Sequence, residues 1–148
     1  MNISEAMDQL TEEGGYVFHG SGANIVEFEP RQAHTIIDGK KVPDGEPAVF
    51  ASTYLDYAIF MALFNKENCP KGYRSGVSYN GKSFTYTATQ ETLDQVTERT
   101  KGKIYVFKRS DFIRRNNTEW VSTKNIKPIL TFEVTRSDFK PGIQVITE

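Results

Sequence analysis

The sequence has little of several residue types that carry common protein chemistry. Its 148 residues contain one cysteine, Cys69, and two histidines. A single cysteine excludes an internal disulfide and any zinc cluster built on several cysteines. Two histidines are too few for most catalytic zinc sites unless carboxylates complete the ligand set. This cysteine usage fits a reducing compartment.

Long apolar runs and an excess of charge are also missing. No run reaches the roughly 18 apolar residues that a membrane-spanning helix needs. The N-terminal stretch is acidic, with Glu5, Asp8 and Glu12, which is not the pattern of a signal peptide. The formal net charge is -1, so bulk electrostatics favours neither nucleic acid nor an anionic membrane. We therefore expect a cytoplasmic protein with no membrane partner.

Several catalytic and nucleotide-binding motifs are absent as well. The sequence has no P-loop, no Gly-x-Gly-x-x-Gly after a strand and no His-Glu-x-x-His. Cys69 precedes Pro70 in a polar stretch with no histidine beside it, which argues against a cysteine nucleophile.

Composition and patterning indicate one ordinary globular domain over residues 1–148, with 38% hydrophobic and 25% charged residues. Apolar residues at helical spacing predict a helix over 3–13 that Gly14-Gly15 terminates. A strand over 16–19 follows, then a long surface excursion over 20–46, of a kind that is often functional. A short strand over 47–52 leads into an apolar, buried helix, for which Thr53 and Asp56 form a capping-box pair.

The second half is rich in strand signals. Asn80-Gly81 lies between two β-prone runs and predicts a hairpin. Residues 91–102 resemble a helix stopped by Gly102, and residues 103–109 alternate as a strand does. Further strands are expected within 119–122, 126–135 and 143–148, with Pro128 at a strand start or on an edge. Few helices and six or more short strands predict an antiparallel α+β domain.

One short stretch carries most of the functional signal. The apolar run Tyr16-Val17-Phe18 delivers His19 onto a Gly-Ser-Gly sequence. Structurally, such a histidine is a hydrogen-bonded surface or core residue and the glycines are turn residues. Functionally, the imidazole can bind a ribose hydroxyl while Gly20 and Gly22 let a ligand approach the backbone closely. The local sequence alone is a weak motif.

The order of three motifs strengthens the functional interpretation. "HGS" comes first, "VFAS" with a tyrosine-containing apolar helix second, and "NTEWVS" last. This order resembles the ADP-ribosyltransferase superfamily, in particular its diphtheria-toxin and poly(ADP-ribose) polymerase branch. The resemblance implies a split antiparallel β-sandwich with flanking helices and an NAD cleft between its halves. His19, Gly20 and Ser21 match the first motif, and the matching histidine in the family contacts the adenosine ribose of NAD.

The second and third motifs match less completely. Phe50-Ala51 fits the second motif, from whose region two tyrosines sandwich the nicotinamide in the family. This chain has Val49 at the first of those positions, and counting from Ala51 places Phe60 at the second. Phe60 can still stack, since stacking needs only the ring face. Tyr54 and Tyr57 are alternative sources of a ring.

The third motif supplies the catalytic candidate, Glu119, followed by Trp120 and Val121. In the family a carboxylate here hydrogen-bonds the nicotinamide ribose and stabilises the oxocarbenium-like cation formed as nicotinamide leaves. A fixed anion beside developing positive charge acts mainly on the transition state. Structurally, a glutamate in such a turn is simply solvated.

Basic residues outside these motifs leave two interpretations open. In the 20–46 excursion, Arg31 offers a fork for the NAD pyrophosphate, and His34 could assist it, although a solvated loop salt bridge is the simpler explanation of Arg31. The cluster of Lys108, Arg109, Arg114 and Arg115 is a charged rim or a phosphate contact, which is no strong nucleic-acid signal.

Three functions are therefore weighed. The first is transfer of ADP-ribose from NAD to an unknown macromolecular acceptor, with nicotinamide released. The second is a non-catalytic module that binds NAD, ADP-ribose or a related nucleotide in the same cleft, which Val49 favours. The third is an RNA 2'-phosphotransferase of the same superfamily, which needs more histidine and arginine sites than two histidines readily furnish.

Overall fold

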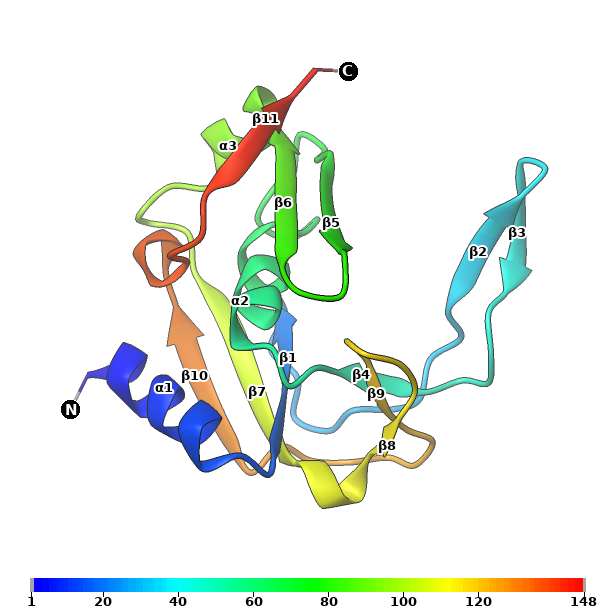
Figure 1. Ribbon diagram of the computed structural model, residues 1–148. Coiled ribbons are helices and arrows are strands. Elements are labelled where there is room, and N and C mark those ends of the chain that lie inside the picture. The colour runs from blue at the N-terminus through cyan, green and yellow to red at the C-terminus, as the bar shows by residue number, and fades with distance from the viewer. Residues whose placement is uncertain (1, 148) are drawn as a thin grey trace.

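The computed structural model describes residues 2–147 and shows a mixed α+β protein with several antiparallel sheets and few helices (Figure 1). The α-helices are α1 (Ile3–Glu13), α2 (Leu55–Leu63) and α3 (Gln90–Gln95). The strands are β1 (Tyr16–Ser21), β2 (His34–Ile37), β3 (Lys40–Pro43), β4 (Val49–Ala51), β5 (Ser75–Tyr79), β6 (Phe84–Thr89), β7 (Gly102–Lys108), β8 (Ile113–Arg114), β9 (Trp120–Ser122), β10 (Leu130–Val134) and β11 (Ile143–Ile146). None of the helices within residues 2–147 combines the length and apolar character that crossing a membrane requires.

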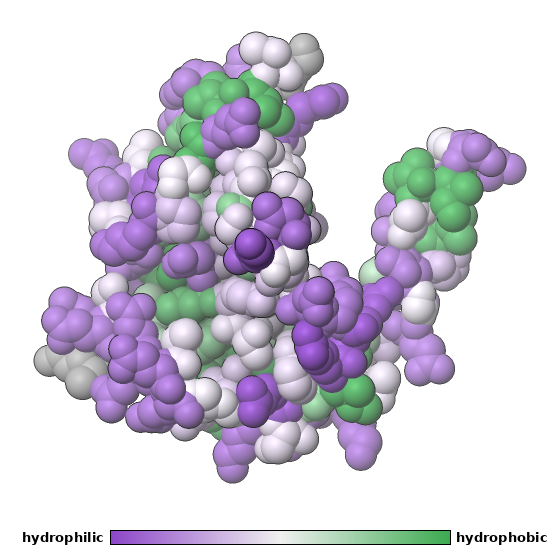
Figure 2. Space-filling model, in the orientation of Figure 1, coloured by the Kyte–Doolittle hydropathy of each residue, from purple (hydrophilic) through white to green (hydrophobic). Residues whose placement is uncertain are grey.

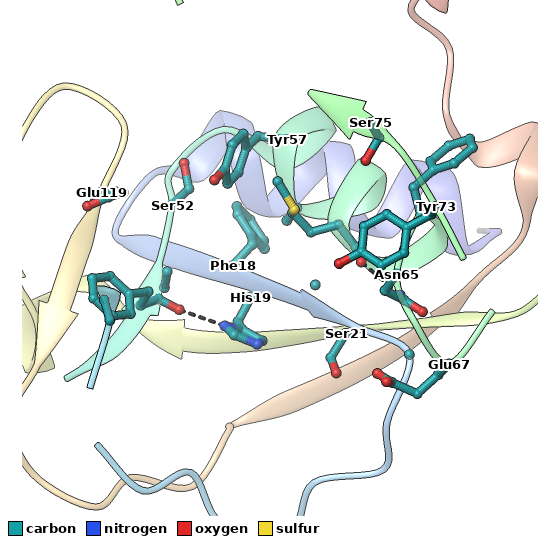
Figure 3. Close-up of a pocket in the computed structure, with 18 of the residues that line it drawn as sticks. Phe18, His19, Ser21, Ser52, Tyr57, Asn65, Glu67, Tyr73, Ser75 and Glu119 are labelled. Atoms are coloured by element: carbon teal, nitrogen blue, oxygen red, sulfur yellow. Dashed lines mark hydrogen bonds between the residues drawn. The ribbon is translucent and has the colours of Figure 1, made fainter. Parts of the chain in front are cut away.

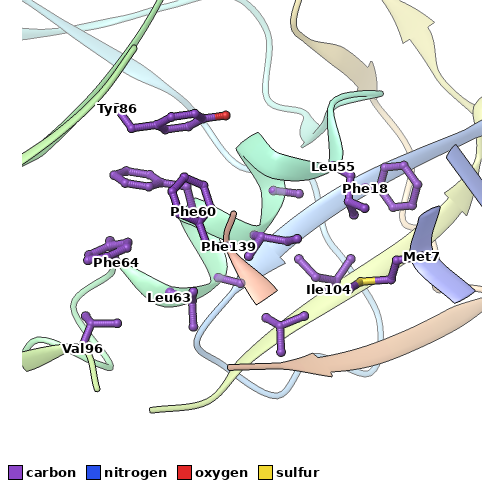
Figure 4. Close-up of a cluster of buried hydrophobic side chains, with 14 of the residues drawn as sticks. Met7, Phe18, Leu55, Phe60, Leu63, Phe64, Tyr86, Val96, Ile104 and Phe139 are labelled. Carbon is purple, nitrogen blue, oxygen red and sulfur yellow. The ribbon is translucent and has the colours of Figure 1, made fainter. Parts of the chain in front are cut away.

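The sheet β1-β7-β10 forms the centre, with β7 paired antiparallel to both neighbours. β7 separates two hydrophobic clusters, because its residues point alternately to the two faces and both faces are buried. Ile104 and Val106 belong to the larger cluster with α1 and α2 (Figure 4). Tyr105 and Phe107 belong to the smaller cluster under β4 and β9. The expected alternation of this strand is therefore present, but neither of its faces is left to solvent.

Two local predictions are confirmed in detail. Helix α1 covers Ile3–Glu13, and the following glycines adopt positive φ angles of 73° and 81°, which favours glycine at both positions. The β5–β6 hairpin turns at Asn80, whose side-chain oxygen accepts hydrogen bonds from the backbone N–H groups of Lys82 and Ser83. Both features depend on residues adjacent in sequence.

The 20–46 excursion is more ordered than expected. Its second half is the β2–β3 hairpin, whose Asp38-Gly39 turn has two positive φ angles, 52° and 75°. Such Asp-Gly turns match the twist of paired strands, so the sequence carries a signal for this hairpin. The hairpin projects from the body and exposes Ile36 (65%) and Ile37 (54%), so Figure 2 shows hydrophobic surface on it.

Two other predictions at element ends are wrong. Helix α2 begins after Tyr54 with no side-chain cap, so the Thr53–Asp56 capping box does not form. Helix α3 ends at Gln95, and Gly102 opens β7 instead of stopping a helix. The strand expected within 143–148 is confirmed as β11, which ends at Ile146, and residue 148 lies outside the described part of the chain.

The strand pairing also departs from a purely antiparallel arrangement. β11 pairs with β6 in parallel, while every other pairing between the named strands of residues 2–147 is antiparallel. β10 begins two residues after Pro128, as expected for a residue that cannot donate to a sheet. The coarse α+β prediction is therefore confirmed, with one parallel pair added.

Candidate functional site

A cavity of about 600 Å³ lies where the end of β1 meets β4, α2 and the turn before β9 (Figure 3). This volume is in the range of small-molecule sites. The three motifs meet here, because His19, Phe50 and Glu119 all line the cavity. Of the other predicted site residues, Gly20, Ser21, Ala51 and Tyr57 line it too. Segments far apart in sequence thus form one site.

The meeting of β1 and β4 depends on one backbone bridge. Phe18 and Ser52 exchange two hydrogen bonds, with N···O distances of 2.7 and 2.9 Å. β4 also pairs with β9, and Ala51 lies opposite Trp120, the residue after Glu119. β4 is therefore the element that carries the third motif to the first.

His19 is held in one orientation. Its Nδ1 lies 2.6 Å from the backbone carbonyl oxygen of Phe50, and because a carbonyl only accepts, Nδ1 carries the proton. Its ring also makes an edge contact with Phe28, with centroids 4.9 Å apart. Burial lowers the pKa of His19 below its ordinary value; the Phe50 carbonyl opposes this shift, and the charge of Arg31 adds to it. A neutral imidazole with Nδ1 occupied leaves Nε2 as a hydrogen-bond acceptor.

The loop after His19 is fastened by its own residues and by the central strand. Ser21 Oγ accepts from the backbone N–H of Ala23 at 3.0 Å. The Tyr105 hydroxyl of β7 donates to the Ala23 carbonyl at 2.7 Å and accepts from the Ile25 N–H at 2.8 Å. One buried tyrosine therefore sets the path of the chain next to Ser21, a role that no local sequence pattern announces.

Gly20 lines the cavity and also packs beneath helix α2. A Cβ built on Gly20 would lie 1.8 Å from the Ala58 carbonyl oxygen and 2.8 Å from the Ala62 nitrogen. Helix α2 therefore rests directly on the β1 backbone at Gly20. At Gly102, on the neighbouring strand, a Cβ would lie 2.3 Å from the Ala62 oxygen. Both glycines are required for the close packing of α2 on the sheet. This packing sets the position of α2 and of Tyr57 on it.

Glu119 occupies the end of the β8–β9 turn. Its backbone N–H donates to Asn116 Oδ1 at 2.9 Å, and its carbonyl accepts from Arg115 N–H at 2.9 Å. Its carboxylate oxygen Oε2 lies 3.5 Å from Arg115 Nη1 and accepts from Asn116 Nδ2 at 3.3 Å. The carboxylate is thus partly buried and positioned by its own turn.

Arg115 connects this turn to the base of the projecting hairpin. Its Nη2 lies 3.0 Å from Asp44 Oδ1, one residue beyond β3, and its guanidinium stacks over the Phe50 ring at 5.6 Å. Asp44 and Arg115 both line the cavity. Among the described lining residues Arg115 is the single arginine or lysine, so it supplies the cationic group that was predicted from Arg31.

Tyr57 brings an aromatic ring to the cavity. Burial raises the pKa of the Tyr57 phenol above its ordinary value, and the negative charge of Glu119 raises it further. The phenol therefore stays protonated at neutral pH and shares the cavity with the Glu119 carboxylate (Figure 3). Met61 follows Tyr57 by four residues and lines the cavity on the same helix face, and Asn65 lines it just beyond the end of α2.

Phe60 is wrongly predicted as a stacking residue. It is 1% exposed and stacks on Phe64 in the core, with centroids 4.7 Å apart. Phe60 lies about 100° around the helix from Met61, whereas the helix face that carries Tyr57 and Met61 opens to the cavity. The register from Ala51 therefore does not place a stacking ring at position 60. Val49 is also buried, in the cluster under β4. Neither of the two expected stacking positions therefore faces the site.

Two further candidates lie outside the cavity. Tyr54 lines a neighbouring groove, where its ring contacts Phe84 and its hydroxyl lies 3.2 Å from that of Tyr79. Arg31 forms a backbone bridge with Ala48 and is not among the lining residues. The positive charge of Arg31 still acts on the site, because it lowers the pKa of His19.

The remaining basic residues are dispersed. The Arg109 guanidinium lies over the Trp120 ring at 5.5 Å, outside the cavity. Arg114 donates to the Asn116 carbonyl and to the Asn117 side chain. Only Arg115 of the four-residue basic cluster lines the cavity. His34 lies in the exposed β2 strand. The cluster is therefore no continuous phosphate-binding surface.

The far end of the cavity was not anticipated. Glu67, Tyr73 and Ser75 line it opposite Glu119 in the view of Figure 3. Glu67 and Tyr73 come from the segment between α2 and β5, and Ser75 is the first residue of β5. No spacing or motif marks these residues. Among residues 2–147, no three His, Cys, Asp or Glu side chains come together in an arrangement that could hold a metal ion.

The chain was also compared with known proteins. No protein-family model, curated protein or solved structure matches it.

Proposed function

We propose that this protein binds NAD in the His19–Glu119 cavity and transfers its ADP-ribose to a macromolecular acceptor, releasing nicotinamide. The observation that carries the proposal is the convergence of His19, Phe50 and Glu119, from three separate segments, on one cavity. The three motifs are ordered as in ADP-ribosyltransferases, and an ADP-ribosyltransferase-like fold is part of the same proposal.

The residues present suit a nucleotide ligand. His19 offers a neutral Nε2 acceptor for a ribose hydroxyl, because its Nδ1 proton is committed to Phe50. Tyr57 offers a ring face for nicotinamide in place of the two expected positions. Arg115 brings a guanidinium to the cavity, and a pyrophosphate shares it with Asp44 and Glu119, with which it is already paired. Each of these groups is held by contacts within the protein before any ligand arrives.

The reaction places positive charge on the ribose. The C1'–N bond breaks, its electron pair leaves with nicotinamide, and an oxocarbenium-like sugar remains. The acceptor then forms a bond to C1' and loses a proton. The Glu119 carboxylate stabilises the cation, and the turn that holds it removes the cost of orienting it during the reaction.

A non-catalytic nucleotide-binding module is the second candidate. The observation in its favour is that Val49 and Phe60 are both buried away from the cavity, so Tyr57 is the only predicted ring that lines it near Glu119. A site that holds the ADP-ribose half well and the nicotinamide half poorly binds the nucleotide without catalysing transfer.

Substitution of Glu119 by Gln distinguishes these functions. Glu119→Gln keeps the size of the side chain and removes its charge, so NAD affinity should change only a few-fold. Nicotinamide release should fall by about 10²–10³, the effect of losing one preorganised electrostatic group. Release is measured with and without cell lysate as a source of acceptor, and affinity by calorimetry. Glu98→Gln, in the exposed loop after α3, is the matched control.

Each outcome has one meaning. If the wild type binds NAD and releases no nicotinamide under either condition, the binding module is correct. Equal release by wild type and Glu119→Gln shows that Glu119 is not the catalytic group. If NAD and ADP-ribose do not bind to the wild type at all, both functions are wrong.

A further inference from the structure

A second groove, of about 380 Å³, lies on another part of the protein. It is bounded by α1, the start of α2, β6 and the loop before β11, and it shares no lining residue with the His19–Glu119 cavity. Its polar and aromatic lining includes Asp8, Thr11, Tyr54, Asp56, Phe84 and Tyr86. We call it the Tyr86 groove.

The hydroxyl of Tyr86 is the unusual feature of this groove. Tyr86 is 4% exposed, and within the described part of the chain its oxygen is buried without a hydrogen-bond partner. In Figure 4 the hydroxyl points away from the Phe64 side of the core. A buried hydroxyl without a partner costs free energy, so such groups are nearly always satisfied in folded proteins. Tyr86 lines the groove, so a bound group that displaces the atoms covering its oxygen would satisfy it.

The groove is negatively charged. Asp8 of α1 and Asp56 of α2 both line it, and among residues 2–147 neither carboxylate forms an ion pair. Partial loss of hydration raises the pKa of Asp56 above its ordinary value, and the charge of Asp8 raises it further. The N-terminus of α2 offsets only about half a unit charge. The described lining contains no lysine, arginine or histidine.

Aromatic rings form the rest of the wall. Tyr54 and Phe84 meet edge to face, with centroids 4.9 Å apart, and Phe84 and Tyr86 stack at 5.9 Å. Ring faces attract cations and cover alkyl chains equally well. Two carboxylates, a buried hydroxyl and aromatic faces together match a positively charged group on an apolar stem.

We propose that the Tyr86 groove binds a primary alkylammonium group. The ammonium lies between Asp8 and Asp56 and donates one hydrogen bond to the Tyr86 oxygen. The alkyl stem lies against Phe84 and Tyr54. An ammonium has three donors, which matches these three acceptors. The same chemistry is presented by a free alkylamine and by a lysine side chain, and the site is independent of the function proposed for the His19 cavity.

The test is a titration of the ¹⁵N-labelled full chain, followed by the amide signals of Thr11, Asp56 and Phe84. 1,5-Diaminopentane represents a free amine and Nα-acetyl-lysine methylamide represents a lysine side chain. 1-Pentanol and pentanoate are the neutral and anionic probes of similar length. We expect saturable shifts with one or both ammonium probes and none with the alcohol or the acid.

Variants locate the binding group. Asp8→Asn and Asp56→Asn should each weaken ammonium binding about tenfold, the effect of losing a charge-assisted hydrogen bond. Asp38→Asn, the same change in the β2–β3 turn, should leave the affinity unchanged. Tyr86→Phe should weaken binding several-fold without lowering the melting temperature of the free protein, because the hydroxyl has no partner to lose.

Four results would overturn the proposal. The first is no saturable shift with either ammonium probe up to about 10 mM. The second is an equal response to the alcohol, which makes the groove merely apolar. The third is ammonium binding that neither aspartate substitution weakens. The fourth is a lower melting temperature for Tyr86→Phe, which shows that the hydroxyl is already satisfied. Saturation by the lysine probe alone assigns the groove to a peptide ligand, and saturation by the diamine alone to a free amine.

Discussion

Replacing Gly20 by alanine tests how the site is built. The new Cβ would lie 1.8 Å from the Ala58 carbonyl oxygen and 2.8 Å from the Ala62 nitrogen, whereas real Cβ contacts shorter than 3.0 Å essentially do not occur. Both atoms belong to the backbone of α2, so no side-chain rotation relieves the clash. The helix must move away from β1 by more than an ångström, and it carries six buried residues with it.

The expected cost follows from this geometry. Overpacking in a core typically costs about 1–3 kcal/mol, and a clash between two backbones belongs at or above the upper end, so we expect at least about 3 kcal/mol. That is a large share of the roughly 5–15 kcal/mol that stabilises a typical domain. At about 2–4 °C per kcal/mol for a chain of this size, the melting temperature should fall by about 6–12 °C.

The matched control is Gly142→Ala. A Cβ at Gly142 would meet no atom within 4 Å, and no positive φ is required there. The control should therefore change stability by less than about 1 kcal/mol, in the stabilising direction, because alanine restricts the unfolded chain. Urea and thermal unfolding followed by circular dichroism give both values. A Gly20→Ala variant as stable as the Gly142→Ala variant would refute the packing argument and return Gly20 to a ligand-contact role.

Three further predictions concern single side chains. Burial lowers the pKa of His19 in the folded protein, so as pH falls the imidazole is protonated first in the unfolded chain. The free energy of unfolding should therefore be constant above about pH 7 and decline as pH falls through about 6.5. In urea unfolding His19→Asn should show less of this decline, and an identical pH profile would contradict the burial argument. Tyr57→Ala should weaken NAD binding by roughly 5- to 150-fold in calorimetry, the range for losing one stacked ring, while Tyr57→Phe should not; equal losses would implicate the hydroxyl instead. Cys69 is 2% exposed and burial raises its thiol pKa, so thiol reagents should react with it only as fast as the protein opens, and fast labelling of the native protein would contradict this.

The elements that the sequence predicted well depend on neighbouring residues. The end of α1 at Gly14-Gly15 and the turn at Asn80-Gly81 follow from local backbone preferences. The Asp38-Gly39 hairpin carried the same kind of signal and was predictable. The role of Gly102 was not predictable. A glycine that ends a helix and a glycine on which a helix packs look alike in the sequence, and only the close approach of the Ala62 backbone shows which one this is.

The amino-acid sequence alone establishes which side chains are available to the site. His19, Ser21 and Glu119 were identified by motif order, and the cavity contains all three. Only the tertiary structure shows that Tyr57 lines the cavity and Phe60 does not, and that Arg115 lines it and Arg31 does not. Which face of α2 opens to the cavity depends on how Gly20 and Gly102 seat the helix on the sheet. Which arginine faces it depends on how β4 pairs with β9. These contacts join residues far apart in the chain. Local spacing shows which side chains share a face of a helix or strand, but not which other element packs against that face.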